Sequence, residues 1–198
     1  MKQQIEHVRF AVLEDAGAIL DIYGPYVEHT PISFEYEVPS LKSFRERMRN
    51  IMKEYPYLVY EKEGKVVGYA YGSSYLSRKA FSWDGEVSIY ISREERGRGI
   101  GRQLYQPLLA MMKEMGIVNA YALIVHPYEA SEQFHKKMGF QEEAVFPNVG
   151  YKLGQWQNLI YMKKQLNSYS CPPQQRKNFP EIQIEAEKIL KGEGIIYS

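Results

Sequence analysis

The 198-residue chain is predicted to fold as a single α/β domain in which a mixed sheet is covered by helices. Three observations predict this class. Some segments carry apolar residues at every second position, as half-buried strands do, whereas others carry them at helical spacing. The segments follow one another as strand, helix, helix, three strands, helix, strand, helix and two strands. Hydrophobic residues make up 44% of the chain, enough for one good core.

The first third of the chain predicts one strand and two helices. HVRFAV, residues 7–12, alternates apolar and other residues and reads as a strand. Glu14 and Asp15 then suit the start of a helix that runs toward Tyr23, because acidic residues favour the first turn. A second, amphipathic helix is predicted within residues 39–55, where apolar residues recur at helical spacing between charges.

The middle of the chain predicts three strands. Residues 57–75 form two strand-like runs around Glu63-Gly64, a turn sequence typical of a hairpin. EVSIYIS, residues 86–92, is a third run rich in β-branched and aromatic residues.

The next helix is predicted to begin after Gly99 and to close at Gly116, because apolar residues recur there at helical intervals. Pro107 lies inside it and should kink it at a cost of about 3 kcal/mol unless its surroundings compensate. A buried strand at 119–125, a short helix within 129–140 that Gly139 ends, and a last strand at 155–166 complete the pattern.

The composition of the chain changes after Leu166. Residues 167–180 form a polar, proline-bearing linker, and residues 181–194 have the pattern of a short amphipathic helix. The chain is therefore divided into a main domain, 1–166, and a C-terminal appendage, 167–198. The helix is expected to pack on the body or on a neighbour rather than to take part in catalysis.

Charge and residue usage exclude several classes of protein. The 25 basic and 24 acidic residues give a net charge of +1 and no general electrostatic reason to expect nucleic acid or a membrane as partner. No run of about eighteen apolar residues occurs, and MKQQIEHVRF lacks the apolar core of a secretory signal, so a cytoplasmic protein is expected. Cys171 has no internal disulfide partner. The four histidines lack the spacing of metal ligands, and no metal site is predicted.

A glycine-rich turn, RGRGIGR at residues 96–102, stands where the third run of strand residues gives way to a helix. Such a turn presents unpaired main-chain N–H groups beside the positive end of the helix dipole, and its glycines let a phosphate approach the main chain. A glycine-rich turn can also serve only as a tight connection between a strand and a helix, without binding an anion. A nucleoside triphosphate site would need Lys and Ser or Thr after the glycines, and a dinucleotide fold would place the turn after the first strand. Both of these sites are disfavoured.

Five stretches in order resemble a known family. The stretches EVSIYISREERGRGIGRQLYQPLL and EASEQFHKKMGF resemble the two main motifs of the GNAT acyltransferases, whose R/Q-x-x-G-x-G/A loop holds the pyrophosphate of coenzyme A. IYGPYVEHTPISFEYEVPS, RKAFSWDGEVSIY and GYKLGQWQNLIYMKK are similar to the phosphinothricin N-acetyltransferase branch. The resemblance covers residues 7 to 164.

The resemblance implies the GNAT fold, a mixed and mostly antiparallel sheet of about seven strands flanked by about four helices. It implies N-acetylation of a small amine, such as phosphinothricin, methionine sulfone or methionine sulfoximine, with acetyl-CoA as co-substrate. It also implies a homodimer. Two alternatives stay open: acetylation of a protein or peptide, and an acyl-CoA-binding protein without activity.

The same resemblance assigns candidate residues. Glu86 matches the glutamate of the family's E-x-S-x-Y stretch and is expected to take the proton of the amine. Burial against Tyr90, Trp83 and Phe81 would have to raise the Glu86 pKa. His135 stands where many acetyltransferases have a tyrosine acid and is a candidate donor to the leaving thiolate. Coenzyme A is expected to contact Ile89, Tyr90, Ile91, Arg96, Gly97, Arg98, Gly99, Ile100, Gly101, Arg102, Tyr128 and Ser131, and the acceptor to contact Phe34, Glu35, Arg78 and Phe81.

The chain departs from the family at four positions. Leu76 and Ser82 stand where members often have arginines, Tyr128 replaces an asparagine, and Asn158 replaces a usual aspartate near the last strand. Loss of two arginines predicts weaker capture of strongly anionic acceptors.

Overall fold

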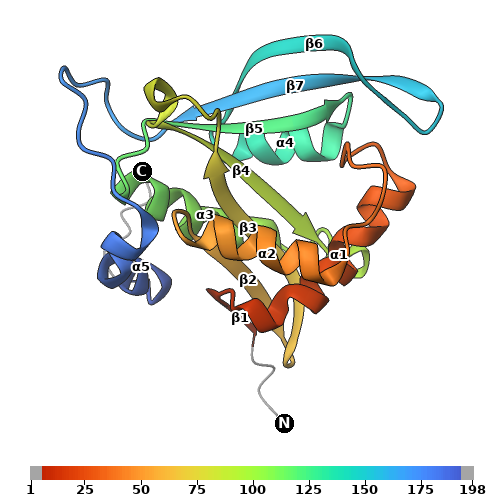
Figure 1. The fold of residues 1–198 in the computed structure, drawn as a ribbon, viewed down its shortest axis with the longest axis horizontal. Coiled ribbons are helices and arrows are strands. Elements are labelled where there is room, and N and C mark those ends of the chain that lie inside the picture. The colour runs from red at the N-terminus through yellow and green to blue at the C-terminus, as the bar shows by residue number, and fades with distance from the viewer. Residues whose placement is uncertain (1–5, 193–198) are drawn as a thin grey trace.

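The computed structural model describes residues 6–192 and contains one seven-stranded sheet in the order β1-β2-β3-β4-β5-β7-β6 (Figure 1). The predicted order of strands and helices is confirmed. The strands are β1 (Glu6–Phe10), β2 (Tyr57–Lys62), β3 (Lys65–Ser74), β4 (Asp84–Ile91), β5 (Asn119–His126), β6 (Gln141–Lys152) and β7 (Gln155–Gln165). The helices are α1 (Ala16–His29), α2 (Leu41–Met52), α3 (Ile100–Glu114), α4 (Glu129–Lys137) and α5 (Gln183–Leu190).

Every neighbouring pair of strands is antiparallel except β4 and β5. These two are parallel and pair only at their first residues, Asp84–Glu86 with 119–121. Beyond Glu86, β4 stays paired with β3 through Ile91, whereas β5 continues along β7. The two strands therefore separate, and Figure 1 shows them diverging from a common origin.

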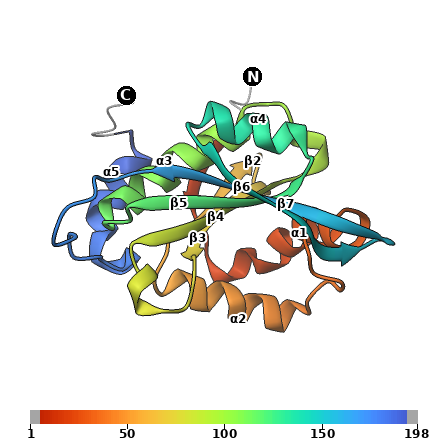
Figure 2. The ribbon, with the colours of Figure 1, turned by 90° about the horizontal axis from the view of Figure 1, so that it is seen from above.

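Helices cover both faces of the sheet. Figure 2 shows α1 and α2 on one side and α3, α4 and α5 on the other. The face toward α1 and α2 has an aromatic-rich core that includes Tyr23, Tyr26, Tyr57 and Tyr69. The other core is built around α3, whose Leu104, Leu108, Met111 and Met112 are fully buried.

Local chemistry explains most of the element boundaries. Ser40 caps α2, since its hydroxyl accepts from the N–H of Ser43 at 3.2 Å. Glu63 and Gly64 have φ values of 52° and 75°, as the predicted β2–β3 hairpin turn requires.

The two helix prolines lie within continuous helices. The first helix was expected to run toward Tyr23, and α1 continues six residues further, through Pro25 to His29. Burial of Tyr26 and Val27 in this extension explains the difference, because tertiary contacts outweigh a local helix breaker. α3 likewise continues through Pro107, which is itself buried.

The C-terminal segment packs on the body, as the sequence predicted. Ile182, Ala186 and Ile189 are buried in the same core as α3, and α5 contacts α3. Among the described residues, no helix combines the length and the apolar character that crossing a membrane requires.

Candidate functional site

A cleft of about 610 Å³ opens where β4 and β5 separate. It is lined by Ile89 and Ile91 of β4, by the glycine turn and the start of α3, and by Tyr128, Ser131 and other residues of the α4 region. A small cavity of about 60 Å³ extends it into the gap between the two strands, where Val87, Ser88, Ala122 and His135 form its walls. The cleft thus leads from the glycine turn toward the point at which the strands begin to part.

The glycine turn has free donors at the mouth of this cleft. Gly97 and Gly99 have φ values of 76° and 82°, so the turn needs residues that tolerate the left-handed region. Among the residues that the structure describes, no acceptor is recorded for the main-chain N–H groups of residues 97–102. The positive end of the 15-residue helix α3 lies at the same place. A diphosphate therefore fits the turn chemically.

Cationic side chains surround the turn. Arg96, Arg102 and Lys137 line the cleft, and Arg96 lies over the ring of Tyr26 at 5.0 Å. Arg98 points toward Glu95, with Nε 3.4 Å from a carboxylate oxygen, and its side chain is exposed. Ile91 was expected to contact coenzyme A, and its main-chain carbonyl already accepts a hydrogen bond from the Tyr26 hydroxyl at 2.5 Å.

Glu86 lies at the point where β4 and β5 part, paired with Ser73 of β3 and Tyr121 of β5. Burial raises the pKa of the Glu86 carboxyl from its ordinary 4.5 to about 7. The negative charge of Glu86 contributes to raising the pKa of four tyrosine hydroxyls, those of Tyr71, Tyr75, Tyr90 and Tyr105. A carboxylate with a pKa near 7 is an effective base at neutral pH.

Two of the three aromatic residues expected to pack against Glu86 have partners elsewhere. The Trp83 indole instead donates to the main-chain carbonyl of Gln174 at 2.6 Å. Phe81 packs edge-on against Tyr75, with ring centroids 6.5 Å apart.

His135 is buried on α4 and lines the small cavity. Its Nδ1 lies 2.8 Å from the carbonyl oxygen of Ser131 and its Nε2 lies 2.9 Å from the hydroxyl of Tyr105. A carbonyl only accepts, so Nδ1 carries the proton and Nε2 accepts from the Tyr105 hydroxyl. Burial lowers the pKa of His135 from 6.5 to about 4, which keeps the imidazole neutral at physiological pH.

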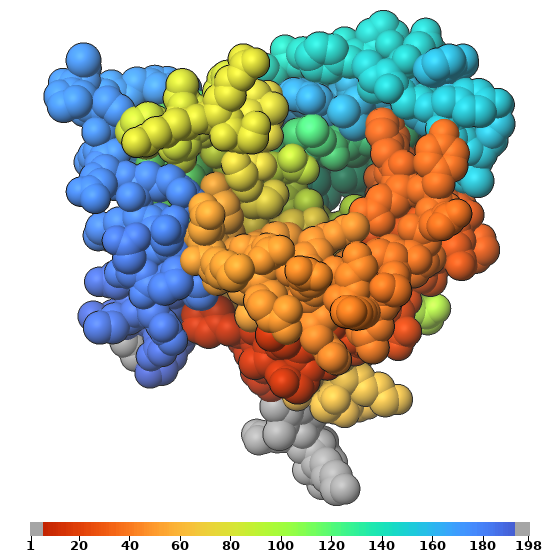
Figure 3. All heavy atoms as spheres, viewed as in Figure 1, coloured from red at the N-terminus to blue at the C-terminus, as the bar shows by residue number. Residues whose placement is uncertain are grey.

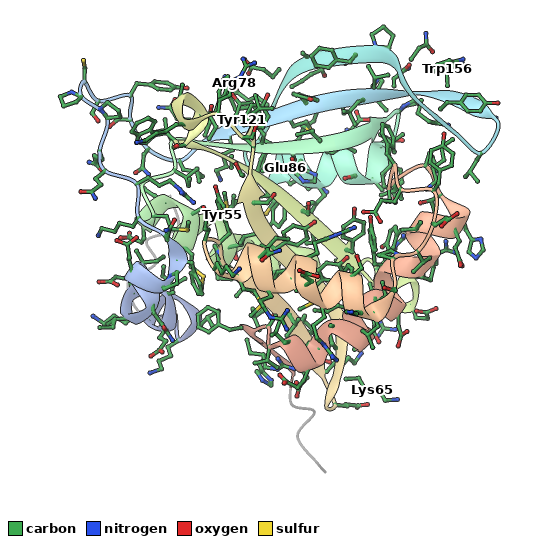
Figure 4. All side chains as sticks on the ribbon, viewed as in Figure 1. Tyr55, Lys65, Arg78, Glu86, Tyr121 and Trp156 are labelled. Atoms are coloured by element: carbon green, nitrogen blue, oxygen red, sulfur yellow. The ribbon has the colours of Figure 1, made fainter. Side chains whose placement is uncertain are left out.

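The face of the sheet that carries Glu86 is hollowed. Figure 3 shows the hollow between α2 and the segment before it on one side and the β6–β7 hairpin on the other. Figure 4 shows Glu86 on β4, with Tyr121 and Arg78 toward the segment between β3 and β4. Tyr121 stacks on Tyr75, with ring centroids 4.2 Å apart and an interplanar angle of 14°.

The segment that carries Phe34 and Glu35 is fixed on both sides of the hollow. Glu35 accepts from Arg47 of α2 at 2.6 Å. On the other side, an added Cβ at Gly150 of β6 would lie 2.8 Å from the Phe34 ring, so the ring lies directly on that strand. The buried Lys152 ammonium donates to the carbonyls of Val27 and Ser33, both at 2.6 Å. Phe34 and Glu35 are thereby held beside the hollow.

Arg78 and Phe81 belong to the segment between β3 and β4. The Arg78 side chain is exposed, and within residues 6–192 no hydrogen bond or ion pair is recorded for it. Of the four predicted acceptor residues, Glu35 and Phe34 thus have fixed partners in Arg47 and Gly150, whereas the Arg78 side chain has none among the described residues.

Sequence reasoning missed several residues of the site. The fold brings together residues from three different elements that are far apart in the sequence. Arg47 pairs with Glu35, Tyr105 bonds to His135, and the pKa of Tyr71 responds to the charge of Glu86. Lys137 on the cleft was also missed, although its place two residues after His135 on a basic helix end was visible in the sequence.

Comparison with known proteins agrees with this geometry. Residues 8–160 match the sequence model of the Acetyltransferase (GNAT) domain family. The chain is 29% identical over 177 residues to a phosphinothricin N-acetyltransferase of Streptomyces viridochromogenes, covering 89% of this chain and 95% of that protein. It is 32% identical over 168 residues to an L-methionine sulfoximine/L-methionine sulfone acetyltransferase of Salmonella typhimurium, covering 83% and 97%.

A solved structure has the same fold. A GNAT superfamily phosphinothricin acetyltransferase from Sinorhizobium meliloti, in complex with AcCoA, superposes with a TM-score of 0.80 and 31% sequence identity. The match covers 84% of this chain and 91% of that one.

Proposed function

Since the chain belongs to the GNAT acetyltransferase family, we propose that it transfers the acetyl group of acetyl-CoA to the amino group of a small amino-acid-like acceptor of the phosphinothricin, methionine sulfone or methionine sulfoximine type. One observation carries the proposal. The cleft between β4 and β5 leads from free main-chain donors at the start of α3 toward the point where the two strands part, and the half-buried Glu86 is the last residue of β4 that pairs with β5 there. This arrangement suits an activated acyl group that is held at one end and attacked at the other.

Residues 97–102 and the cations around them would hold the diphosphate of coenzyme A. Each free N–H of the turn offers a hydrogen bond, and Arg96, Arg102 and Lys137 add positive charge at the mouth of the cleft. The pantetheine arm would lie in the gap beyond Glu86, against the main chain of Ile89 and Tyr90.

Glu86 is proposed as the general base. An amino acid reaches the site mostly as its ammonium form, and the nitrogen can attack only after it loses a proton. The Glu86 carboxylate takes this proton, directly or through a water. The free amine then forms a bond to the carbonyl carbon of the thioester, and the bond from that carbon to sulfur breaks, so the sulfur leaves as thiolate. The nitrogen releases its second proton to solvent, which leaves a neutral amide. A positioned base of this kind contributes roughly 10²- to 10⁴-fold to the rate.

The acid role predicted for His135 requires a proton on Nε2, whereas the hydrogen bonds favour a proton on Nδ1. We therefore propose that His135 positions Tyr105 at the floor of the gap and that the thiolate takes its proton from solvent. The pH profile of His135→Ala separates the roles, because loss of an acid would change the alkaline limb and loss of a positioning residue would not.

The acceptor is proposed to bind in the hollow around Glu86. Phe34 and Glu35 would line one side, and Arg78 and Phe81 the other. The free guanidinium of Arg78 suits a carboxylate, and the ring pair of Tyr75 and Tyr121 offers a flat apolar wall to the rest of the acceptor.

We also propose a cytoplasmic homodimer. Support for the dimer comes from the β6–β7 hairpin, where Phe146, Tyr151, Leu153 and Trp156 are exposed to between 42% and 63%. An apolar group of this kind on an edge strand is typical of a surface that another chain covers. The cytoplasmic location rests on the lone Cys171.

Thiol release from acetyl-CoA across a panel of acceptors tests the function. We expect release with methionine sulfone, methionine sulfoximine or related amino acids, and one N-acetylated product for each thiol. Release with peptides or polyamines alone would replace the proposed acceptor class. No release with any amine, despite binding of coenzyme A, would leave a binding protein without transferase activity.

A further inference from the structure

The segment 167–182, here called the strap, joins β7 to α5 and lies beyond residues 8–160, which match the family. Figures 1 and 3 show it passing beside the segment between β3 and β4. Most of its side chains are exposed, yet its course is held by specific contacts at both ends. Holding a polar segment in one conformation costs conformational entropy, so specific contacts must offset that cost.

The strap is anchored at its start and at its end. The Asn167 amide donates to the carbonyls of Lys113 and Ile117 at 2.9 and 2.8 Å, where α3 ends. At the other end, the Phe179 N–H donates to the carbonyl of Glu54 at 2.9 Å, and its ring lies 5.4 Å from that of Phe10. α5 then inserts its apolar side chains into the core.

Between these anchors the strap contacts Trp83, the last residue before β4. The Trp83 indole N–H donates to the main-chain carbonyl of Gln174 at 2.6 Å. The main-chain carbonyl of Trp83 accepts from the N–H groups of Val118 and Asn119 at 2.7 and 3.3 Å. Trp83 is therefore tied on one side to the start of β5 and on the other to the strap.

The strap also contacts residues that pack against the end of β3, where the segment between β3 and β4 begins. The Arg176 guanidinium lies 4.8 Å from the centre of the Tyr55 ring and pairs with Glu54 at 3.3 Å. The Tyr55 ring lies against Gly72 of β3, since an added Cβ there would be 3.3 Å from its Cδ1, and Tyr55 interacts with Ser74. Ser74 is the last residue of β3.

One end of segment 75–83 is thus bonded to the strap through Trp83, and the strand residues before its other end are linked to the strap through Tyr55. This segment, here called the acceptor loop, carries Arg78 and Phe81 and contains no strand or α-helix of its own, only a single turn of 3₁₀-helix at residues 79–81. A loop with so little internal structure is held mainly by its neighbours.

We propose that the strap positions the acceptor loop, and that Trp83 is the positioning residue through which acceptor binding depends on the C-terminal segment. The inference rests on the proposed function, because the loop matters only if the hollow binds an acceptor. Binding of coenzyme A would not depend on the strap, since the cleft at the start of α3 is lined by other elements.

Trp83→Phe tests the proposal, because it removes the indole donor and keeps an aromatic ring. We expect the KM for the acceptor to rise about three- to tenfold, the effect of one lost hydrogen bond, with the KM for acetyl-CoA unchanged. Amide hydrogen exchange of residues 75–82, measured without any substrate, should become faster. Ile19→Ala is the matched control, because it weakens the core on the other face of the sheet without touching the strap or the acceptor loop.

The proposal fails if Trp83→Phe leaves both the acceptor KM and the loop exchange as in the wild type. It also fails if Ile19→Ala raises the acceptor KM as much as Trp83→Phe, since general loss of stability would then explain both. The exchange measurement needs no turnover, so it stands even if the wild type releases no thiol. That last result would overturn the proposed function and leave the structural role of the strap intact.

Discussion

At the residue scale, the chemistry of the site depends on where the fold places single titratable groups. A glutamate ahead of an alternating run was visible in the sequence, and so was the need to raise its pKa by burial. The structure raises the pKa of Glu86 by burial to about 7, and the Glu86 charge in turn contributes to raising the pKa of Tyr71 and Tyr105. Sequence reasoning could not find Tyr71 or Tyr105, because neither is near Glu86 along the chain.

Glu86→Gln should lower kcat by about 10²-fold or more while the KM for acetyl-CoA stays the same, because only the base is removed. In the wild type, kcat/KM for the acceptor should rise with pH as Glu86 loses its proton near pH 7. Steady-state rates between pH 5 and 9 measure both. Full turnover by Glu86→Gln would remove the assignment.

Although Glu86→Gln should lower kcat, it should raise the free energy of unfolding at alkaline pH. The folded pKa of Glu86, about 7, lies above its ordinary 4.5, so its contribution to stability is complete below pH 4.5 and is lost as pH rises through 7. Glu86→Gln should therefore be more stable than the wild type at pH 8, and this advantage should shrink toward pH 5. Urea unfolding at the two pH values checks the difference.

At the scale of the elements, local patterns predicted strands, helices and their order, because periodicity and turn residues are properties of short segments. They did not predict that α1 continues past Pro25 or that β4 and β5 pair at only three positions. Both features depend on contacts between distant residues.

The glycine turn before α3 gives a prediction at this scale. Gly99→Ala places a Cβ at φ 82° and should raise the dissociation constant of coenzyme A about tenfold or more, because the methyl group points into the open space of the cradle. Gly64→Ala is the matched control, with a similar φ of 75° and equally open surroundings in the β2–β3 turn. Calorimetric titration measures both. Equal affinity in the two variants would show that the turn does not hold the phosphates.

At the scale of the whole molecule, two layers of helices leave one hairpin largely uncovered. The β6–β7 hairpin carries exposed apolar side chains beyond the hollow, and the label of Trp156 in Figure 4 marks its outer end. The sequence suggested a dimer only through resemblance. It could not locate the surface, because alternation along a strand does not tell which face another chain covers.

Light scattering should give a mass of two chains of 23.1 kDa in solution. Trp156→Glu should shift this mass toward one chain, because a charge at the centre of an apolar interface is left without a partner. Ile184→Glu places the same charge on an exposed apolar residue of α5 and should leave the dimer intact. A wild-type protein that is monomeric throughout would contradict the proposed assembly.

A crystal structure of the protein with acetyl-CoA tests the central claim most directly. The account predicts the diphosphate on the main-chain N–H groups of residues 97–102, the pantetheine arm between β4 and β5, and the thioester carbonyl beside Glu86. Electron density for the diphosphate away from the start of α3, or a thioester directed away from Glu86, would contradict it.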